Sequence, residues 1–120
     1  MIPLGEYVDG KLKECADRVY ETTVPSNATF PYIFYRFASS STVELREDFI
    51  LEVNVWGYGK SSVSVEEIAQ AVKEKLDGTH HLETGLQTSI SLVNRLSPPD
   101  PDEKVIRREL RFNCRTYLIN

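Results

Sequence analysis

The first segment of the chain has apolar residues at steps of three and four positions. This spacing places them on one face of a helix. They are Leu4, Val8, Leu12, Cys15 or Ala16, and Val19. We predict a helix over about residues 3–18, because Pro3 suits a first turn that needs no backbone donor. Residues 21–29 have the polar and proline-containing composition of a loop.

Two segments with the composition of strands follow. Residues 31–38 are rich in aromatic and branched side chains and are too short for a helix. Residues 39–42, Ser-Ser-Ser-Thr, are expected to interrupt them, and residues 44–58 then alternate between apolar and polar. The apolar parity of this second strand holds Phe49, Leu51, Val53 and Val55, and the other parity holds Glu52, Asn54 and Trp56. The pattern predicts a hairpin with a serine-rich loop.

A second helix is predicted over residues 65 to about 77. Ser64-Val-Glu-Glu67 has the form of a capping box, in which Ser64 accepts from the Glu67 amide and that glutamate reaches back. An apolar stripe follows, made of Ile68, Ala71, Val72 and Leu76. Gly78 stands where a left-handed residue commonly ends a helix.

The last third of the chain predicts a second hairpin. Residues 79–85 have a loop composition, residues 86–96 and 104–118 alternate as strands, and the three prolines of residues 97–102 exclude an interior strand between them. The order is therefore α-β-β-α-β-β. We predict an α+β two-layer sandwich over residues 1–120, with one antiparallel four-stranded sheet and two helices on its apolar face.

Composition and charge narrow the class of protein. A chain of 120 residues with 41% apolar and 27% charged side chains is typical of one globular domain. A net charge of −4 makes it a poor candidate for binding nucleic acid. Residues 104–120, however, carry five basic side chains against Glu109, a net +4, so that the first 103 residues carry −8. The basic strand is either a solvated face or a surface that meets an acidic surface on a neighbouring subunit.

No arrangement of residues predicts a catalytic, cofactor or metal site. Cys15 and Cys114 lie too far apart in sequence for a cysteine zinc motif, and Cys114 is expected to be an inert core residue. His80, His81 and Glu83 offer ligand types, as do carboxylate groups around residues 44–48 and 100–103, but polar loops are the simpler interpretation. Neither a secretory signal nor an apolar run of about 20 residues is present, so cytoplasmic synthesis is expected.

Large side chains on the polar parity of the strands are more informative. Trp56, Tyr58 and either Tyr35 or Tyr32 are predicted to lie on the sheet face opposite the helices. They are either covered by a loop or form a subunit contact, where aromatic residues and arginine are enriched. We favour the contact, with the predicted interface residues Trp56, Tyr58, Arg107, Arg111 and Arg115.

The order of segments resembles a known family. After the first helix come Pro31-Tyr-Ile-Phe-Tyr35, then Arg46-Glu-Asp-Phe-Ile-Leu-Glu-Val-Asn-Val-Trp-Gly57, the helix ending Lys73-Glu-Lys-Leu-Asp-Gly78, and Arg107-Arg-Glu-Leu-Arg-Phe-Asn-Cys114. The chain resembles the tail terminator or tail-completion (head–tail joining) proteins of long non-contractile-tailed phages and prophages. That resemblance implies a small, non-enzymatic α+β subunit that forms a ring, typically hexameric, at the head-proximal end of the tail tube.

The resemblance also implies the partners. They are other copies of the chain, the major tail tube protein and the head connector or head-closure protein, without cofactor, membrane or sequence-specific nucleic acid. The location would be the bacterial host cytoplasm during assembly and then the head–tail junction of the virion. Residues 39–48 and 97–103 are expected to be mobile and to order on contact with a partner. Two alternatives stay open: a head–tail adaptor of a neighbouring position, and a small-molecule-binding or enzymatic α+β domain with a pocket between sheet and helices.

Overall fold

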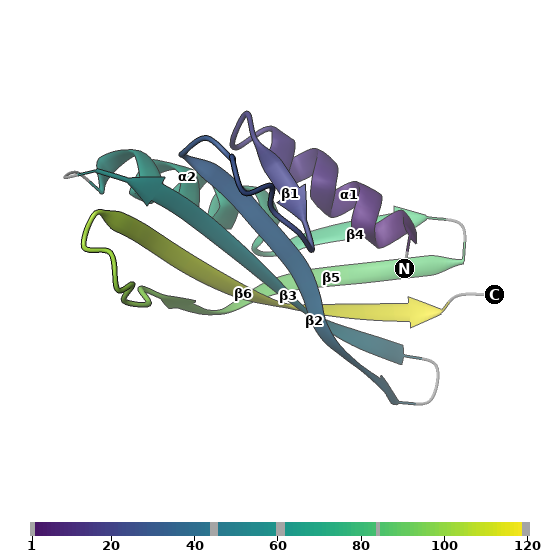
Figure 1. Ribbon diagram of the computed structural model, residues 1–120. Coiled ribbons are helices and arrows are strands. Elements are labelled where there is room, and N and C mark those ends of the chain that lie inside the picture. The colour runs from purple at the N-terminus through teal and green to yellow at the C-terminus, as the bar shows by residue number, and fades with distance from the viewer. Residues whose placement is uncertain (1, 44–45, 60–61, 84, 119–120) are drawn as a thin grey trace.

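Two helices lie against one side of a long, twisted sheet in the computed structural model, which describes residues 2–43, 46–59, 62–83 and 85–118 (Figure 1). The elements are α1 (Ile2–Lys13), β1 (Val19–Glu21), β2 (Tyr32–Val43), β3 (Arg46–Tyr58), α2 (Val63–Leu76), β4 (Thr79–Glu83), β5 (Leu86–Leu96) and β6 (Val105–Leu118). The molecule extends 51 Å along its longest axis and 25 Å and 23 Å along the others.

The sheet has six strands in the order β1-β2-β3-β6-β5-β4. All neighbours pair antiparallel except β1, which runs parallel to β2. At the centre, β3 pairs with β6 without interruption from Arg46 opposite Tyr117 to Tyr58 opposite Val105. Since α2 and two strands separate β3 from β6 in sequence, the middle of the sheet is a long-range contact.

The predicted four-stranded antiparallel sheet is wrong, because two edge strands were missed. β1 has three residues at the boundary between the predicted helix and the predicted loop, and β4 contains His80 and His81, which do not alternate as an apolar strand would. Both form because a neighbour is available: Ile33 donates its backbone N–H to Arg18 O (2.9 Å), and β4 pairs along β5 from Thr79 to Glu83. Tertiary pairing, rather than local pattern, creates these strands.

Two predicted boundaries also change. The first helix ends at Lys13 rather than Arg18, since the amides of Cys15 and Ala16 both bond to Leu12 O and turn the chain toward the sheet. The serine-rich segment is not a loop: residues 39–43 continue β2 opposite residues 46–50 of β3, after a register shift between Phe37 and Ser39. The hairpin therefore continues past a bulge into the serine-rich segment, where backbone pairing with β3 rather than burial of side chains holds the strand. Residues 44–45 lie outside the described part of the chain.

The start of α2 differs from the prediction, whereas its end agrees. The helix begins at Val63 with Ser62 as N-cap, so Ser64 lies inside it and makes no capping box. The Glu66 amide bonds to Ser62 O (2.9 Å), and the Ser62 side chain makes no capping hydrogen bond. Gly78 has a φ of 76°, the left-handed conformation that the sequence predicted.

The hydrophobic core fills the space between the helices and one face of the sheet. α1 contributes one buried row, α2 another, and the odd positions of β3 meet the even positions of β6, which confirms the parity predicted for β3. The buried members of the core are Leu4, Val8, Leu12, Ile33, Tyr35, Phe49, Leu51, Val53, Val55, Val65, Ala69, Val72, Leu76, Ile90, Leu110, Phe112 and Cys114. The buried row of α2 runs through Val65 and Ala69 instead of the predicted Ile68 and Ala71.

Gly57 permits the closest approach of α2 to the sheet. A Cβ atom at this position would overlap Cγ2 of buried Val65. We predict that Gly57→Ala lowers the free energy of unfolding by about 1–3 kcal/mol, because the helix must move away from β3. Urea denaturation measures the change. Gly10→Ala is the control: Gly10 lies in α1, where an added methyl group would meet nothing within 4 Å, so this change should stabilise the protein by up to about 1 kcal/mol.

Candidate functional site

The helices leave one face of the sheet uncovered. Both helices lie on the same side of the sheet (Figure 1). They share a core with the odd positions of β3, so the side chains of the opposite parity project away from both helices. We call the side chains of this parity on β2, β3 and β6 the open face. Its main members are Tyr32, Arg36, Glu52, Asn54, Trp56, Tyr58, Arg107, Glu109, Arg111 and Arg115.

Five aromatic rings gather at one end of the open face. We call them the aromatic cluster: Tyr20, Phe30, Tyr32, Trp56 and Tyr58. Ring centroids are 5.3 Å apart for Phe30 and Tyr32, 5.5 Å for Phe30 and Tyr58, 5.7 Å for Tyr20 and Tyr32, and 6.3 Å for Tyr32 and Trp56. Tyr58 is 53% exposed and Phe30 37% exposed. A group of stacked, partly exposed aromatic rings is typical of a contact surface. Tyr32 is thus the open-face tyrosine, whereas Tyr35 is a core residue.

Arginines continue the open face beyond the aromatic cluster. The Arg107 guanidinium lies 5.0 Å from the centroid of the Trp56 ring, and its Nε donates to Asn54 Oδ1 (3.2 Å). Arg107 and Arg111 both approach Glu109, at 3.5 Å and 3.4 Å. Trp56 and Arg107, which the sequence placed on separate strands, are therefore in contact, and Glu109 links Arg107 to Arg111.

Arg115 lies farther along the same row. It is exposed, and it has no ion pair or hydrogen bond with any residue that the structure describes. Eight positions of extended strand separate it from Arg107, about 26 Å at 3.3 Å per residue. The five predicted interface residues thus form a strip along the open face instead of a single cluster.

Two buried carboxylates on the open face were not singled out from the sequence. Glu52 and Glu109 are 6% and 5% exposed although no helix covers them. Glu52 accepts from Arg36 (3.0 Å) and stands opposite Arg111 in the ladder, while Glu109 lies between two arginines. The alternation of basic and acidic residues in residues 107–111 was the available signal. These carboxylates hold the arginine side chains along the sheet.

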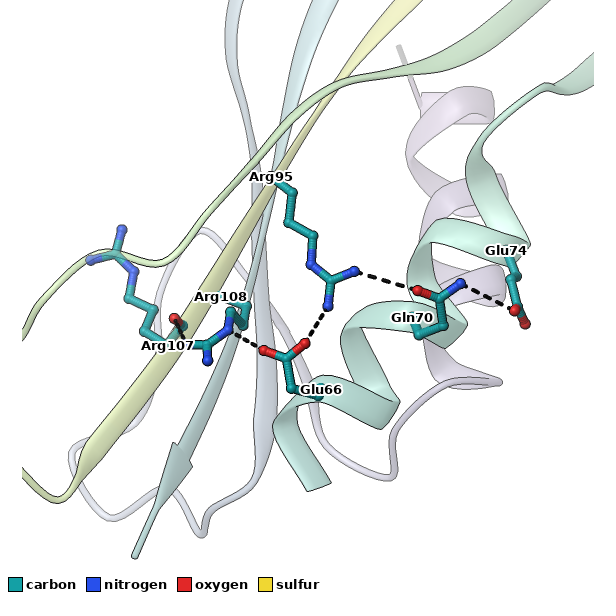
Figure 2. Close-up of polar contacts among 6 residues, drawn as sticks. All are labelled: Glu66, Gln70, Glu74, Arg95, Arg107 and Arg108. Atoms are coloured by element: carbon teal, nitrogen blue, oxygen red, sulfur yellow. Dashed lines mark hydrogen bonds and ion pairs between the residues drawn. The ribbon is translucent and has the colours of Figure 1, made fainter. Parts of the chain in front are cut away.

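On the other side of β6, Arg108 holds α2 to the sheet. Glu66 of α2 accepts from Arg95 Nη2 (2.7 Å) and from Arg108 Nε, and Gln70 also bonds to Arg95 (3.4 Å). Figure 2 shows that Arg107 and Arg108, adjacent in sequence, leave the strand on different sides. The basic charge of the last strand is therefore divided: Arg108 is a structural residue, and the open face keeps Arg107, Arg111 and Arg115.

A cleft opens beside the N-terminal helix. It has a volume of about 680 Å³ and lies between α1, the end of β1 and the middle of β2. We call it the acidic cleft, because Glu6, Asp9 and Glu21 are among its lining residues, with Gly5, Thr22, Tyr35, Arg36 and Phe37.

The centre of the acidic cleft is the Tyr35 hydroxyl. It donates to Asp9 Oδ1 (2.9 Å). Burial raises the pKa of Tyr35 well above its ordinary value, and hydrogen bonds to Asp9 and Glu21 raise it further. The phenol therefore stays protonated at neutral pH and is unsuited to acid–base chemistry. Thr22, at a φ of 66°, fixes the rim by donating its amide to Tyr35 O (3.0 Å).

The other candidate chemical groups are separated. On β4, His80 faces Ser89 with Nδ1 and Oγ 3.0 Å apart, whereas the His81 ring stacks on Tyr7 of α1 at 4.2 Å. Within the described ranges, no three histidine, cysteine or carboxylate side chains are grouped as metal ligands would be. Cys114 is fully buried, and burial raises the pKa of its thiol to about 12. That is the opposite of the shift that activates a nucleophilic cysteine.

No helix in the described part of the chain has the length and hydropathy needed to cross a membrane. The proline-rich connection between β5 and β6 is held by local bonds, from the Asp102 amide to Asp100 Oδ1 (2.9 Å) and from the Lys104 amide to Asp102 Oδ1 (3.0 Å).

These features define a small α+β domain in which one sheet face, the open face, carries a row of aromatic and arginine side chains and is not covered by a helix. The family model described as "Tail completion protein gp17" matches residues 7–117, and the chain belongs to this family. The resemblance predicted from the order of segments is thereby confirmed, and the role of the protein is structural, in the completion of a phage tail.

A solved structure has a similar fold. A chain in "Virion of native gene transfer agent (GTA) particle" has a TM-score of 0.67 and 15% sequence identity, over 88% of this chain and 84% of that chain. At this identity the similarity concerns the fold alone. No curated protein sequence matches the chain.

We predict that Glu66→Gln lowers the free energy of unfolding by about 1–2 kcal/mol, because Arg95 and Arg108 lose the carboxylate that they share. Thermal and urea denaturation measure it. Glu67→Gln is the matched control, since Glu67 is the exposed neighbour on the same helix, and a surface change of this kind should stay within about 0.5 kcal/mol. Equal effects of the two variants would contradict the assigned role of Glu66.

The buried thiol predicts a dependence of stability on pH. Because the folded-state pKa of Cys114 is raised to about 12 and an unfolded cysteine titrates near 8.5, its contribution is complete below about pH 8.5 and is lost as pH rises toward 12. Cys114→Ala should be less stable at pH 7 by about 1–2 kcal/mol but should lose less stability between pH 8.5 and 10.5. Urea denaturation across this range tests it, and parallel pH profiles would refute the buried thiol.

Proposed function

We propose that the protein caps the tail tube and joins it to the head connector as a ring of identical subunits that contact one another through the open face. The observation that carries this proposal is the strip of aromatic and arginine side chains on a sheet face that no helix covers. Its partners beyond other copies of the chain are the major tail tube protein and the head connector or head-closure protein. Assembly takes place in the bacterial cytoplasm, and the product lies at the head–tail junction of the virion.

The composition of the strip supports a subunit contact. Trp, Tyr and Arg are the residues that most often dominate binding energy at interfaces, where they insert into a partner and lose water. The aromatic cluster supplies apolar area, and Arg107 is already oriented by Trp56 and Asn54, so it loses little freedom on binding. The side chains of this surface are therefore preorganised for contact with a partner.

A ring requires a heterologous contact, in which one surface of a subunit meets a different surface of the next. The uneven charge of the chain supports that arrangement. Arg107, Arg111 and Arg115 lie on the open face, whereas Glu6 and Glu21 line the acidic cleft on the helix side of the sheet.

The proposed role is not enzymatic. The ionisable groups with raised pKa values, such as Tyr35 and Cys114, are shifted toward their protonated forms and lie in separate parts of the molecule. An acid–base or nucleophilic mechanism needs such groups to meet around a substrate.

We predict that Arg111→Glu combined with Arg115→Glu prevents assembly, because the reversed charges meet an acidic partner surface. Sedimentation velocity and native mass spectrometry measure the assembly mass, and circular dichroism checks the fold. Lys73→Glu combined with Lys104→Glu changes the net charge equally, at side chains without ion-pair partners among the described residues, and should assemble like the unmodified protein. Unchanged oligomers of the arginine variant would overturn the proposed contact.

A further inference from the structure

We propose that the acidic cleft of one copy receives Arg111 and Arg115 from the open face of the next copy. This inference rests on the proposed ring and assigns the second surface of its repeating contact. It makes the occupant of the cleft a segment of this same chain, with guanidinium groups as the chemistry that is recognised.

The acidic side of the contact has carboxylates without a cationic partner in their own subunit among the described residues. Glu6 lies exposed on α1 and Glu21 exposed at the end of β1, and neither has an ion pair among the described residues. Asp9 is occupied, since it accepts from Tyr35 and pairs with Lys13 at 2.6 Å. Arg36, the cation in the lining, is paired with Glu52 instead of with these residues. The negative charge of the cleft is therefore not neutralised within one subunit.

The basic side of the contact has guanidinium N–H groups without an acceptor among the described residues. Arg115 is exposed and unpaired among the described residues, and the side chain of Arg111 is 43% exposed while its Nε has no hydrogen-bond partner among them. Glu109, which approaches Arg111 Nη2 at 3.4 Å, is shared with Arg107. A guanidinium binds a carboxylate through two parallel N–H groups. A carboxylate of another subunit could form such a pair with Arg115 and with the Nε side of Arg111.

The walls of the acidic cleft also suit a guanidinium. Phe37, which is partly buried, lines it beside the carboxylates, so an arginine entering it would lie against an aromatic side chain while its N–H groups reach acidic oxygens. Arginine is favoured in this mixed setting because its planar group is more weakly hydrated than an ammonium and stacks on rings.

Arg111 and Arg115 are not among the residues that line the acidic cleft of their own subunit. They lie on the open-face parity of the central strand β6, whereas the cleft is lined by α1, β1 and β2. Figure 1 shows β1 and α1 at a distance from β6, which is separated from β1 by β2 and β3. A contact between these arginines and the cleft joins different faces of successive copies. Such a contact repeats around a ring.

Three variants test the pairing. The basic-side variant carries Arg111→Glu and Arg115→Glu, the acid-side variant carries Glu6→Lys and Glu21→Lys, and the swapped variant carries all four changes. Sedimentation velocity over a concentration series compares them with the unmodified chain. Asp9 is kept in every variant because it accepts from Tyr35 at 2.9 Å. Since Glu21 also bonds to Tyr35, Glu6→Lys alone is measured beside the acid-side variant.

The basic-side and acid-side variants should each self-associate at least about 10-fold more weakly than the unmodified chain, because like charges then face each other. Their equimolar mixture should assemble with the two variants alternating, because the arginines of the acid-side variant meet an unchanged cleft and the reversed charges of the two variants also attract each other. The swapped variant should regain the assembly of the unmodified chain. Glu6→Lys alone, at an exposed position on α1, gives the same direction of change if Glu21→Lys lowers stability.

The outcomes separate this pairing from the ring itself. If the basic-side variant fails to assemble while the acid-side variant assembles normally, the open-face contact stands and the cleft pairing is overturned. If both variants assemble normally, or the unmodified chain stays monomeric throughout, the pairing and the proposed self-assembly both fall. A mixture that stays monomeric, with a swapped variant that does not recover, overturns the pairing.

Discussion

The antiparallel pairing of β3 with β6 determines the rest of the structure. Because successive residues of a strand point to opposite faces, this one register separates a row of buried apolar side chains from a row of arginines, carboxylates and Trp56. The first row forms the core with the two helices. The second row is left on a face that two short helices cannot also cover. The core and the open face are thus two consequences of the same pairing.

The same register also divides the charge of the chain. The last strand is basic as a whole, but Arg108 turns toward α2 and is bound by Glu66, where it fixes the helix (Figure 2). Arg107 and Arg111 are held along the open face by Glu109, and Arg115 extends the row. A net charge counted along the sequence therefore overstates the charge available to a partner. The acidic excess is concentrated as well, since Glu6 and Glu21 lie around one cleft.

The sequence predicted the elements with strong periodicity and missed those that depend on pairing. Alternation was sufficient for β3, β5 and β6, and the apolar stripe was sufficient for α2, with Gly78 at its end. β1 and β4 could not be predicted in this way, because three residues at the boundary of the predicted helix and a His-His pair become strands only beside β2 and β5. The capping box predicted at Ser64 was also wrong, because the helix starts one residue earlier and Ser64 lies inside it. The glutamate of this first turn that has a partner is Glu66, which pairs with Arg108 of the distant strand β6.

The candidate site could also be predicted only in part from the sequence. Strand parity placed Trp56, Tyr58 and the three arginines on one face, as observed. Phe30 and Tyr20 could not be assigned to the aromatic cluster, because they come from a loop and from the missed strand β1. The acidic cleft was not predicted, since its carboxylates come from α1 and β1 and meet only through the fold.

Trp56 is the single tryptophan of the chain and lies in the open face, so its fluorescence reports directly on whether that face becomes buried. The decisive measurement is iodide quenching of Trp56 across a concentration series in which sedimentation velocity follows assembly. The proposed contact predicts that quenching decreases in step with the fraction of assembled protein. Assembled particles in which Trp56 is quenched as efficiently as in the monomer would contradict it.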